Sequence, residues 1–201
     1  SSKILYTLSN DKRNSSFNPT EGYEFGIGQT LSALVSDVPS IESSFFGSYY
    51  QEIAPKFNSS IKYRVRAINS LTDKDILIND RLHLTDSYLR GFKSRGVGPI
   101  DGDDHVGGNY SVNSSAATTI PSFIPETWNI ATGVFMDAAN VWGIDYDKDG
   151  LDDSNSIRMS VGLGINWISP LGPLSVSYAT PIMKESTDDV REFSFNLGTV
   201  F

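Results

Sequence analysis

Alternation of apolar and polar residues at every second position limits this chain's possible folds more than any other feature of its sequence. From 157 to 168, one set of alternate positions holds Ile157, Met159, Val161, Leu163, Ile165 and Trp167. The positions between them hold Arg158, Ser160, Gly162, Gly164 and Asn166. Because successive side chains of a β-strand point to opposite faces, this pattern predicts a strand with one apolar and one polar face.

The same alternation recurs along the whole chain. It is clear at 61–68, 129–142, 157–168, 174–179 and 190–201, and weaker at 3–9, 21–33, 43–53 and 108–120. Long polar connections at 70–107 and 143–155 contrast with short turns rich in Pro and Gly at 121–127 and 169–173. Long loops at one end and short turns at the other are typical of outer-membrane β-barrels. The sequence therefore predicts an all-β, antiparallel transmembrane barrel wall of about nine strands.

A soluble β-sandwich would also alternate and is the alternative fold. Three observations favour a barrel. Gly, Ser, Asn and basic residues such as Lys62, Arg64 and Arg66 oppose the apolar rows, which suits a water-filled lumen. Strands of about ten residues match a tilted membrane span. Aromatic residues stand near the expected strand ends, where barrels carry interfacial girdles: Trp128, Trp142, Trp167, Tyr178 and Phe201.

Composition and charge exclude several classes of protein. No apolar run approaches the roughly 18 to 20 residues of a membrane-spanning helix. A net charge of -8 would repel phosphates, so we expect no nucleic-acid partner. Cysteine is absent, which excludes disulfide scaffolds and zinc–thiolate sites. His83 and His105 lie in polar loop sequence without a nucleophile elbow, and we therefore expect no enzyme.

Several motifs occur in an order and spacing that point to one family. Residues 157–181 read IRMSVGLGINWISPLGPLSVSYATP, residues 134–142 read VFMDAANVW, and residues 18–22 read NPTEG. A loop between them carries Leu89-Arg90-Gly91-Phe92, followed by residues 96–99. Together these segments resemble the BamA family, also called the bacterial surface antigen family, over nearly the whole chain. The resemblance implies that residues 1–201 are the C-terminal part of a barrel of about 16 strands, without its POTRA domains and first strands.

The resemblance also implies a function in the bacterial outer membrane. Members of the family fold β-barrel proteins and insert them through a lateral seam, without covalent chemistry. The implied partners are outer-membrane lipids, unfolded outer-membrane protein clients and assembly-complex lipoproteins. A two-partner secretion pore or a TamA-like translocation protein is the alternative, and an adhesin-like or passive structural barrel is a third class. Free strand edges would also allow a chain of this length to self-associate.

The loop motif Leu89-Arg90-Gly91-Phe92 supplies the first candidate site. In the family, the arginine of this motif folds back into the lumen and meets acidic residues of the wall. Asp137 falls on the predicted lumen face, so we predict an Arg90–Asp137 salt bridge that holds the loop inside the barrel. Two departures leave the details open. Residues 115–121 (SAATTIP) lack the second acidic partner common in the family, and residues 83–87 (HLTDS) replace its Gly pair.

The last predicted strand supplies the second candidate site, the lateral seam. A poorly paired edge strand can bind another strand through main-chain hydrogen bonds. Gly198 matches a family position where the strand bends inward, although a small lumen residue would serve equally well. Phe201 resembles the aromatic end signal of barrel proteins and could also anchor the strand in the interface. The predicted seam residues are Phe193, Phe195, Leu197, Gly198 and Phe201.

One further segment has the spacing of a calcium-binding loop. Its residues are Asp145, Asp147, Asp149, Leu151 and Asp153, with Gly150 where the chain would turn. The twelfth position is Ser156 in place of the bidentate Glu, and the flanks read as strands. No cofactor is required by the sequence. Calcium is the candidate, and an ordinary acidic surface hairpin is the alternative.

Overall fold

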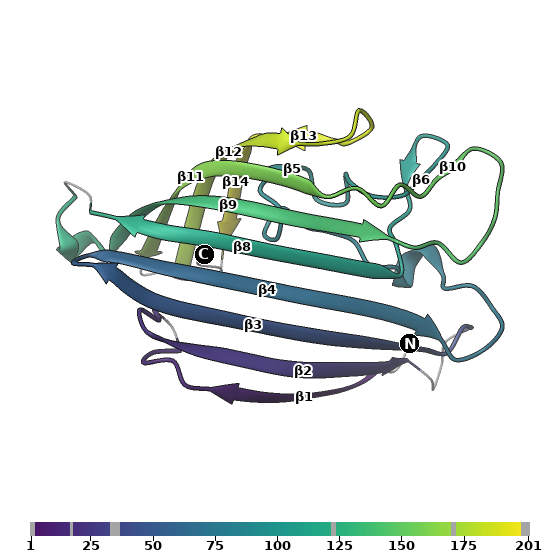
Figure 1. Ribbon diagram of the computed structural model, residues 1–201, viewed down its shortest axis with the longest axis horizontal. Coiled ribbons are helices and arrows are strands. Elements are labelled where there is room, and N and C mark those ends of the chain that lie inside the picture. Colours follow the sequence, from purple (N-terminus) through teal and green to yellow (C-terminus); the bar gives the residue numbers. More distant parts are fainter. Residues whose placement is uncertain (1–2, 17, 33–36, 122–123, 170–171, 198–201) are drawn as a thin grey trace.

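A single antiparallel sheet dominates the structure, a computed structural model that describes residues 3–16, 18–32, 37–121, 124–169 and 172–197 (Figure 1). The sheet has nine strands in the order β1-β2-β3-β4-β8-β9-β11-β12-β14. It curves so strongly that β11, β12 and β14 pass behind β8 and β9 in Figure 1. The strands are β1 (Lys3–Asp11), β2 (Gly22–Ser32), β3 (Ser40–Ala54), β4 (Phe57–Ser70), β8 (Tyr110–Ile120), β9 (Ile130–Trp142), β11 (Arg158–Ser169), β12 (Gly172–Met183) and β14 (Phe193–Leu197).

Each of these strands pairs with its neighbours in chain order, as in an up-and-down barrel wall. All nine overlap the segments in which the alternation predicted strands, and the all-β antiparallel fold is confirmed. Within the described residues, β1 pairs only with β2, and β14 only with β12, so the two are the edges of an open sheet.

Several short strands and 3-10 helices lie within the connections between the long strands. They are η1 (Ile78–Asp80), β5 (Gly91–Phe92), β6 (Ile100–Asp101), β7 (Asp104–His105), η2 (Glu126–Trp128), β10 (Leu151–Asp152) and β13 (Val190–Arg191). Strand β5 pairs with β13, and β6 lies between β10 and β7. In the described part of the chain no helix is long and apolar enough to cross a membrane.

The connections divide between the two ends of the sheet as the sequence predicted. The turn end joins β1 to β2, β3 to β4, β8 to β9 and β11 to β12 by segments of two to ten residues. The loop end, on the right in Figure 1, carries the two longest segments, 71–109 and 143–157, and the shorter segment 184–192. We call residues 71–109 the interior loop and residues 184–192 the final loop. Short turns face the periplasm in outer-membrane barrels, which orients the wall.

The alternation has the orientation that a barrel requires. In β11, Leu163 and Ile165 are 60% and 45% exposed, whereas Ser160 and Asn166 on the other face are 0% and 8% exposed. Phe45, Val65 and Phe195 are likewise exposed on other strands. The apolar rows therefore face outward and do not meet in a dry interior, as the sandwich alternative requires.

The interior differs from a uniformly wet lumen at the loop end. Leu82, Leu84, Leu89, Phe92 and Val97 of the interior loop form a buried apolar cluster with Ile68, Ala139 and Val141 of the wall. The segment read as a long polar connection thus folds back and builds a dry core. Alternation also breaks in β9, where the three consecutive residues Ala139, Asn140 and Val141 are all buried because the loop covers them.

The start of the last strand also differs from the prediction of 190–201. Val190 and Arg191 form the separate strand β13, which pairs with Phe92 and Gly91 of the interior loop. Strand β14 begins only at Phe193. The reason is that main-chain pairing with the interior loop draws residues 190–191 away from the ladder with β12.

Candidate functional site

The interior loop brings its motif directly against the barrel wall. Gly91 has a φ of +91°, a left-handed conformation that side chains with a Cβ rarely adopt. A Cβ at this position would lie 3.3 Å from both Cβ and the carbonyl oxygen of Ala179 in β12. Leu89 and Phe92, on either side, are each 1% exposed within the apolar cluster. Glycine therefore lets the loop backbone touch the wall while its neighbours anchor in the core.

The same turn brings Arg90 and Asp137 together. Arg90 Nε donates to Asp137 Oδ2 at 2.7 Å, and Arg90 Nη2 donates to Oδ1 at 2.6 Å. The main-chain N–H of Arg90 adds a third bond to Oδ2 at 3.1 Å. The guanidinium also lies over the Phe135 ring, with Cζ 3.3 Å from the ring centroid. A bidentate, charge-assisted pair of this kind is the strong form of the interaction, because its geometry is fixed by the planar guanidinium.

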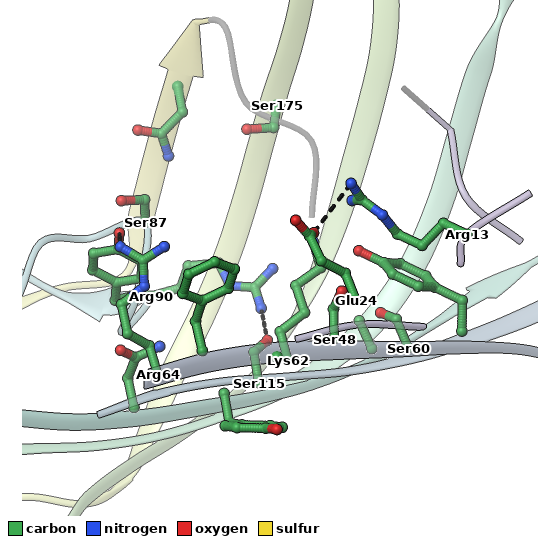
Figure 2. Close-up of a pocket in the computed structure, with 18 residues that line it drawn as sticks. Arg13, Glu24, Ser48, Ser60, Lys62, Arg64, Ser87, Arg90, Ser115 and Ser175 are labelled. Carbon is green, nitrogen blue, oxygen red and sulfur yellow. Dashed lines mark hydrogen bonds and ion pairs between the residues drawn. The ribbon is translucent and has the colours of Figure 1, made fainter. Parts of the chain in front are cut away.

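Ser115 completes this site and was not predicted. Its hydroxyl accepts a hydrogen bond from Arg90 Nη2 at 2.9 Å and donates one to Asp137 Oδ1 at 2.7 Å. Figure 2 shows Ser115 on the wall beside Arg90, joined by a dashed line. Ser115 lies directly opposite Asp137 in the β8–β9 register. The sequence contained that signal, since residues opposite each other on one face of a ladder are neighbours. The Ser115 hydroxyl therefore lies on β8, in the segment 115–121 that lacks the second acidic partner common in the family.

A cavity of about 330 Å³ lies beside this site, toward the turn end (Figure 2). Its lining carries four basic side chains, Arg13, Lys62, Arg64 and Arg90, and one acidic side chain, Glu24. Glu24 pairs with Arg13 at 3.1 Å. Arg64 donates to the Tyr88 hydroxyl at 3.0 Å and stacks on Phe46 and Tyr88. The basic row expected from β4 therefore does face the lumen.

A second buried ion pair ties the final loop to the wall. Arg158 Nε donates to Asp188 Oδ1 and Oδ2 at 3.1 and 3.0 Å, and Arg158 Nη1 donates to Asn140 Oδ1 at 3.0 Å. The side chains of Arg158 and Asp188 are 1% and 0% exposed. The sequence placed Arg158 on the lumen face but gave no sign of its partner, which lies 30 residues away in a loop.

A third pair involves the segment that resembled a calcium-binding loop. Asp145 pairs with Arg81 of the interior loop and accepts a hydrogen bond from the Ile76 N–H at 2.7 Å. Burial alone would raise the pKa of Asp145, but the bonds from Ile76 and Asn109 and the charge of Arg81 together lower it. The Arg81 guanidinium also lies over the Tyr146 ring, 5.0 Å from its centroid.

The remaining carboxylates of that segment have surroundings different from that of Asp145, and calcium binding by this segment stays a prediction. Asp153 accepts hydrogen bonds from the main chain of Gly143 and Ile144, while Asp147 and Asp149 are exposed. Leu151, also named in the candidate calcium segment, lies in β10 opposite Asp101. Among the described residues no three acidic, His or Cys side chains converge as a metal site would require.

The two histidines take part in the folded loops. His83 Nε2 accepts a hydrogen bond from Arg95 Nη2 at 2.9 Å, since arginine can only donate. Burial and the charge of Arg95 lower the pKa of His83 to about 4. His105 lies within hydrogen-bond distance of the carbonyl oxygens of Gly98 and Thr187.

The predicted seam residues occupy the free edge of the sheet where they can be described. Phe193, Phe195 and Leu197 of β14 are 58%, 58% and 68% exposed, all on the outward face. Ser194 and Asn196 alternate with them on the lumen face. Gly198 and Phe201 lie outside the described residues.

Fold and site together define a class of protein. An outward apolar surface, an antiparallel wall and an interior loop fastened to that wall by a buried arginine describe an outer-membrane β-barrel with a lumen-filling loop.

Comparison with known proteins specifies the family. Residues 1–201 match the Omp85 superfamily domain, and the chain belongs to that superfamily. The outer-membrane assembly factor BamA of Neorickettsia risticii is 27% identical over 100% of this chain and 27% of its own length. BamA of Neisseria meningitidis is 31% identical over 56% of this chain and 17% of its own length. The chain thus spans about a quarter or less of these relatives.

Solved structures agree with this assignment. The crystal structure of BamA from Haemophilus ducreyi lacking POTRA domains 1–3 superposes with a TM-score of 0.85. It is 29% identical to this chain and covers 96% of it, while the chain covers 41% of that structure. The predicted family, the barrel fold and the outer-membrane location are confirmed by these similarities.

Proposed function

We propose that this chain forms part of the β-barrel wall of an assembly factor that folds β-barrel proteins and inserts them into the outer membrane. The relatives named BamA are outer-membrane protein assembly factors, and the match to BamA of Neorickettsia risticii extends over 100% of this chain. Because it spans only part of those proteins, further strands are expected to complete the wall. The proposed activity needs no covalent chemistry, and its partners are outer-membrane lipids, unfolded barrel clients and assembly-complex lipoproteins.

One observation carries the proposal: the outer edge of β14. This strand pairs with β12 on one side, and the described residues provide no strand on its other side. Its unpaired main-chain N–H and C=O groups can form a ladder with an incoming strand. Along this edge strand, the outward-facing Phe193 and Phe195 alternate with the lumen-facing Ser194 and Asn196. A client strand with apolar residues toward lipid and small polar residues toward the lumen would fit this register.

The experiment requires the full-length protein in lipid vesicles and an unfolded eight-stranded outer-membrane barrel as client. We expect the vesicles that contain the protein to speed client folding, measured by the electrophoretic shift of the heat-resistant folded form. A photoreactive residue at Asn196 should then cross-link to the client during folding.

A matched position tests whether that contact is specific. Ser60 in β4 lines the same lumen cavity as Asn196 but lies far from either edge of the sheet. We expect little cross-linking from a photoreactive residue there. Equal cross-linking at both positions, or client folding no faster than in empty vesicles, would contradict the proposal.

A further inference from the structure

The final loop, residues 184–192, is fastened far more tightly than a surface connection requires. It joins β12 to the edge strand β14. Its Asp188 lies buried against Arg158 of β11, and its Val190 and Arg191 pair with the interior loop. In Figure 1, β13 lies beside β5, the strand with which it pairs. Both attachments occur within five residues of Phe193, the first residue of β14.

The attachment to the wall is a buried network in which each guanidinium nitrogen of Arg158 has a partner. Arg158 uses Nε and Nη2 for Asp188 and Nη1 for Asn140 and the Ser156 carbonyl oxygen. Asp188 Oδ2 also accepts the main-chain N–H of Glu185 at 2.7 Å, which closes the loop on itself. Because the carboxylate and guanidinium are both removed from water, loss of either partner would leave a buried, uncompensated charge. The pair therefore fixes the position of Asp188 relative to β9 and β11.

The attachment to the interior loop is a main-chain ladder. The Lys93 N–H donates to the Asp189 carbonyl oxygen at 2.9 Å, and the Asp189 N–H donates to the Gly96 carbonyl oxygen at 2.8 Å. The ladder continues with Val190 opposite Phe92 and Arg191 opposite Gly91. A Cβ on Gly96 would lie 2.6 Å from Asp189 Cβ, so the two chains are in close contact. The final loop is thus attached to the Leu89–Phe92 motif, which Arg90 in turn attaches to the wall.

The last residue of the final loop sets the start of the edge strand. The Ala179 N–H donates to the Glu192 carbonyl oxygen at 2.8 Å, and the Tyr178 hydroxyl donates to Glu192 Oε2 at 2.8 Å. Tyr178 is also opposite Phe193 in the β12–β14 register. Since side chains alternate, a slip of one residue here would turn Phe193 and Phe195 toward the lumen.

We propose that Arg158 and Asp188 are positioning residues for the free edge of β14. Their buried pair holds the final loop, so that β14 keeps a fixed register and a fixed position along the barrel axis relative to an incoming strand. The interior loop supports the same segment through β5 and β13, which couples the motif around Arg90 to the edge. The positioning role rests on the proposed function, whereas the attachment itself is independent of it.

Hydrogen exchange in the full-length protein, measured by mass spectrometry in lipid nanodiscs, tests the attachment. In Arg158→Ala and Asp188→Ala we expect amides of residues 184–197 to exchange at least about tenfold faster than in the wild type. Asp188→Asn keeps the side-chain shape and should also speed exchange at residues 184–197. It replaces the alanine variants in this test if they fail to fold. The double variant should exchange no faster than either single variant, because both remove one interaction.

Two internal comparisons separate positioning from general stability. Amides of the β3–β4 hairpin should exchange at the wild-type rate in the same variants. Arg66→Ala removes a partly exposed ion pair with Glu42 inside the wall, and should leave residues 184–197 unchanged. A uniform rise over the whole barrel, or wild-type exchange at 193–197, would overturn the proposal.

Client insertion in vesicles tests the consequence. We expect Asp188→Asn to slow client folding and to weaken the Asn196 cross-link, while Arg66→Ala matches the wild type. Faster exchange at 184–197 with wild-type insertion would overturn the positioning role. Failure of the wild-type protein itself to promote folding would instead refute the proposed function, and the exchange data would still decide whether the pair holds β14.

Discussion

Arg90 and Asp137 lie on opposite sides of the boundary between loop and wall, joined by a bidentate pair whose side chains are only 6% and 1% exposed. The Arg90 guanidinium also donates a hydrogen bond to the Ser115 hydroxyl and lies over the Phe135 ring. The pair is therefore one buried attachment of the interior loop to the wall, and substitution of its members tests it directly.

Arg90→Ala is expected to lower the free energy of unfolding of the full-length barrel by about 3–5 kcal/mol, because Asp137 would be left as an unpaired buried charge. Unfolding by guanidinium in detergent, followed by tryptophan fluorescence, measures the change. Arg66→Ala is the control, since its pair with Glu42 is about a quarter exposed and is expected to contribute about 0–1 kcal/mol. Equal losses in both variants would contradict the special role of Arg90.

Ser115→Ala is expected to cost about 1–3 kcal/mol, because the hydroxyl bonds two charged groups. The adjacent Ser114 is exposed, and Ser114→Ala provides a control with the same chemical change. In an Arg90→Ala background the Ser115→Ala cost should shrink, since the shared network is already broken. Additive losses in the same unfolding experiment would show that Ser115 acts independently of Arg90.

Gly91→Ala is expected to destabilise the interior loop more than Gly150→Ala. Both glycines have positive φ values, +91° and +85°, so both substitutions carry a backbone cost of about 1–2 kcal/mol. Only the Gly91 methyl group would press against Ala179, because a Cβ at Gly150 meets nothing within 4 Å. Proteolysis of the interior loop measures the difference. Similar cleavage rates in both variants would mean that close packing against the wall is unimportant.

Acid should loosen the interior loop through His83. Its pKa in the fold is about 4, lowered from 6.5 by burial and then by the charge of Arg95. Between these values the unfolded loop binds a proton that the folded loop excludes, so stability present above pH 6.5 is lost as the pH falls toward 4. At pH 5 the full shift would correspond to about 2 kcal/mol, and solvent screening of this partly exposed group reduces it to about 1 kcal/mol.

The measurement for His83 is hydrogen exchange of the interior loop at pH 7.5 and pH 5, corrected for intrinsic exchange rates. Arg81, Arg95 and His105 act on the same ring, so His83→Gln provides the test of assignment. This variant should show a smaller pH dependence than the wild type. An unchanged pH dependence would place the titrating group elsewhere.

Leu163→Arg is expected to destabilise the barrel in lipid by about 2–4 kcal/mol, because the side chain lies on the outward face near the middle of β11. Ser60→Arg places the same side chain in the lumen cavity, where water can solvate it. Unfolding in lipid vesicles compares the two. A larger loss for Ser60→Arg would reverse the assigned orientation of the wall.

The sequence alone determined the strands and their orientation. Period-two alternation is a local property, because each side chain's face follows from its neighbours along the same strand, and Leu163 and Ser160 were assigned correctly for this reason. It also put Asp137 on the lumen face, and the family motif supplied Arg90 as its partner.

Only the tertiary structure decided how the loops fold and what they contact. Alternation carries no information about Asp188, which meets Arg158 across 30 residues, or about Asp145, whose carboxylate binds Arg81 where spacing suggested calcium. Strand β13 likewise left the predicted last strand because the interior loop offers main-chain partners to Val190 and Arg191. Such contacts depend on the path of the chain through space, and each competes with the local preference that the sequence displays.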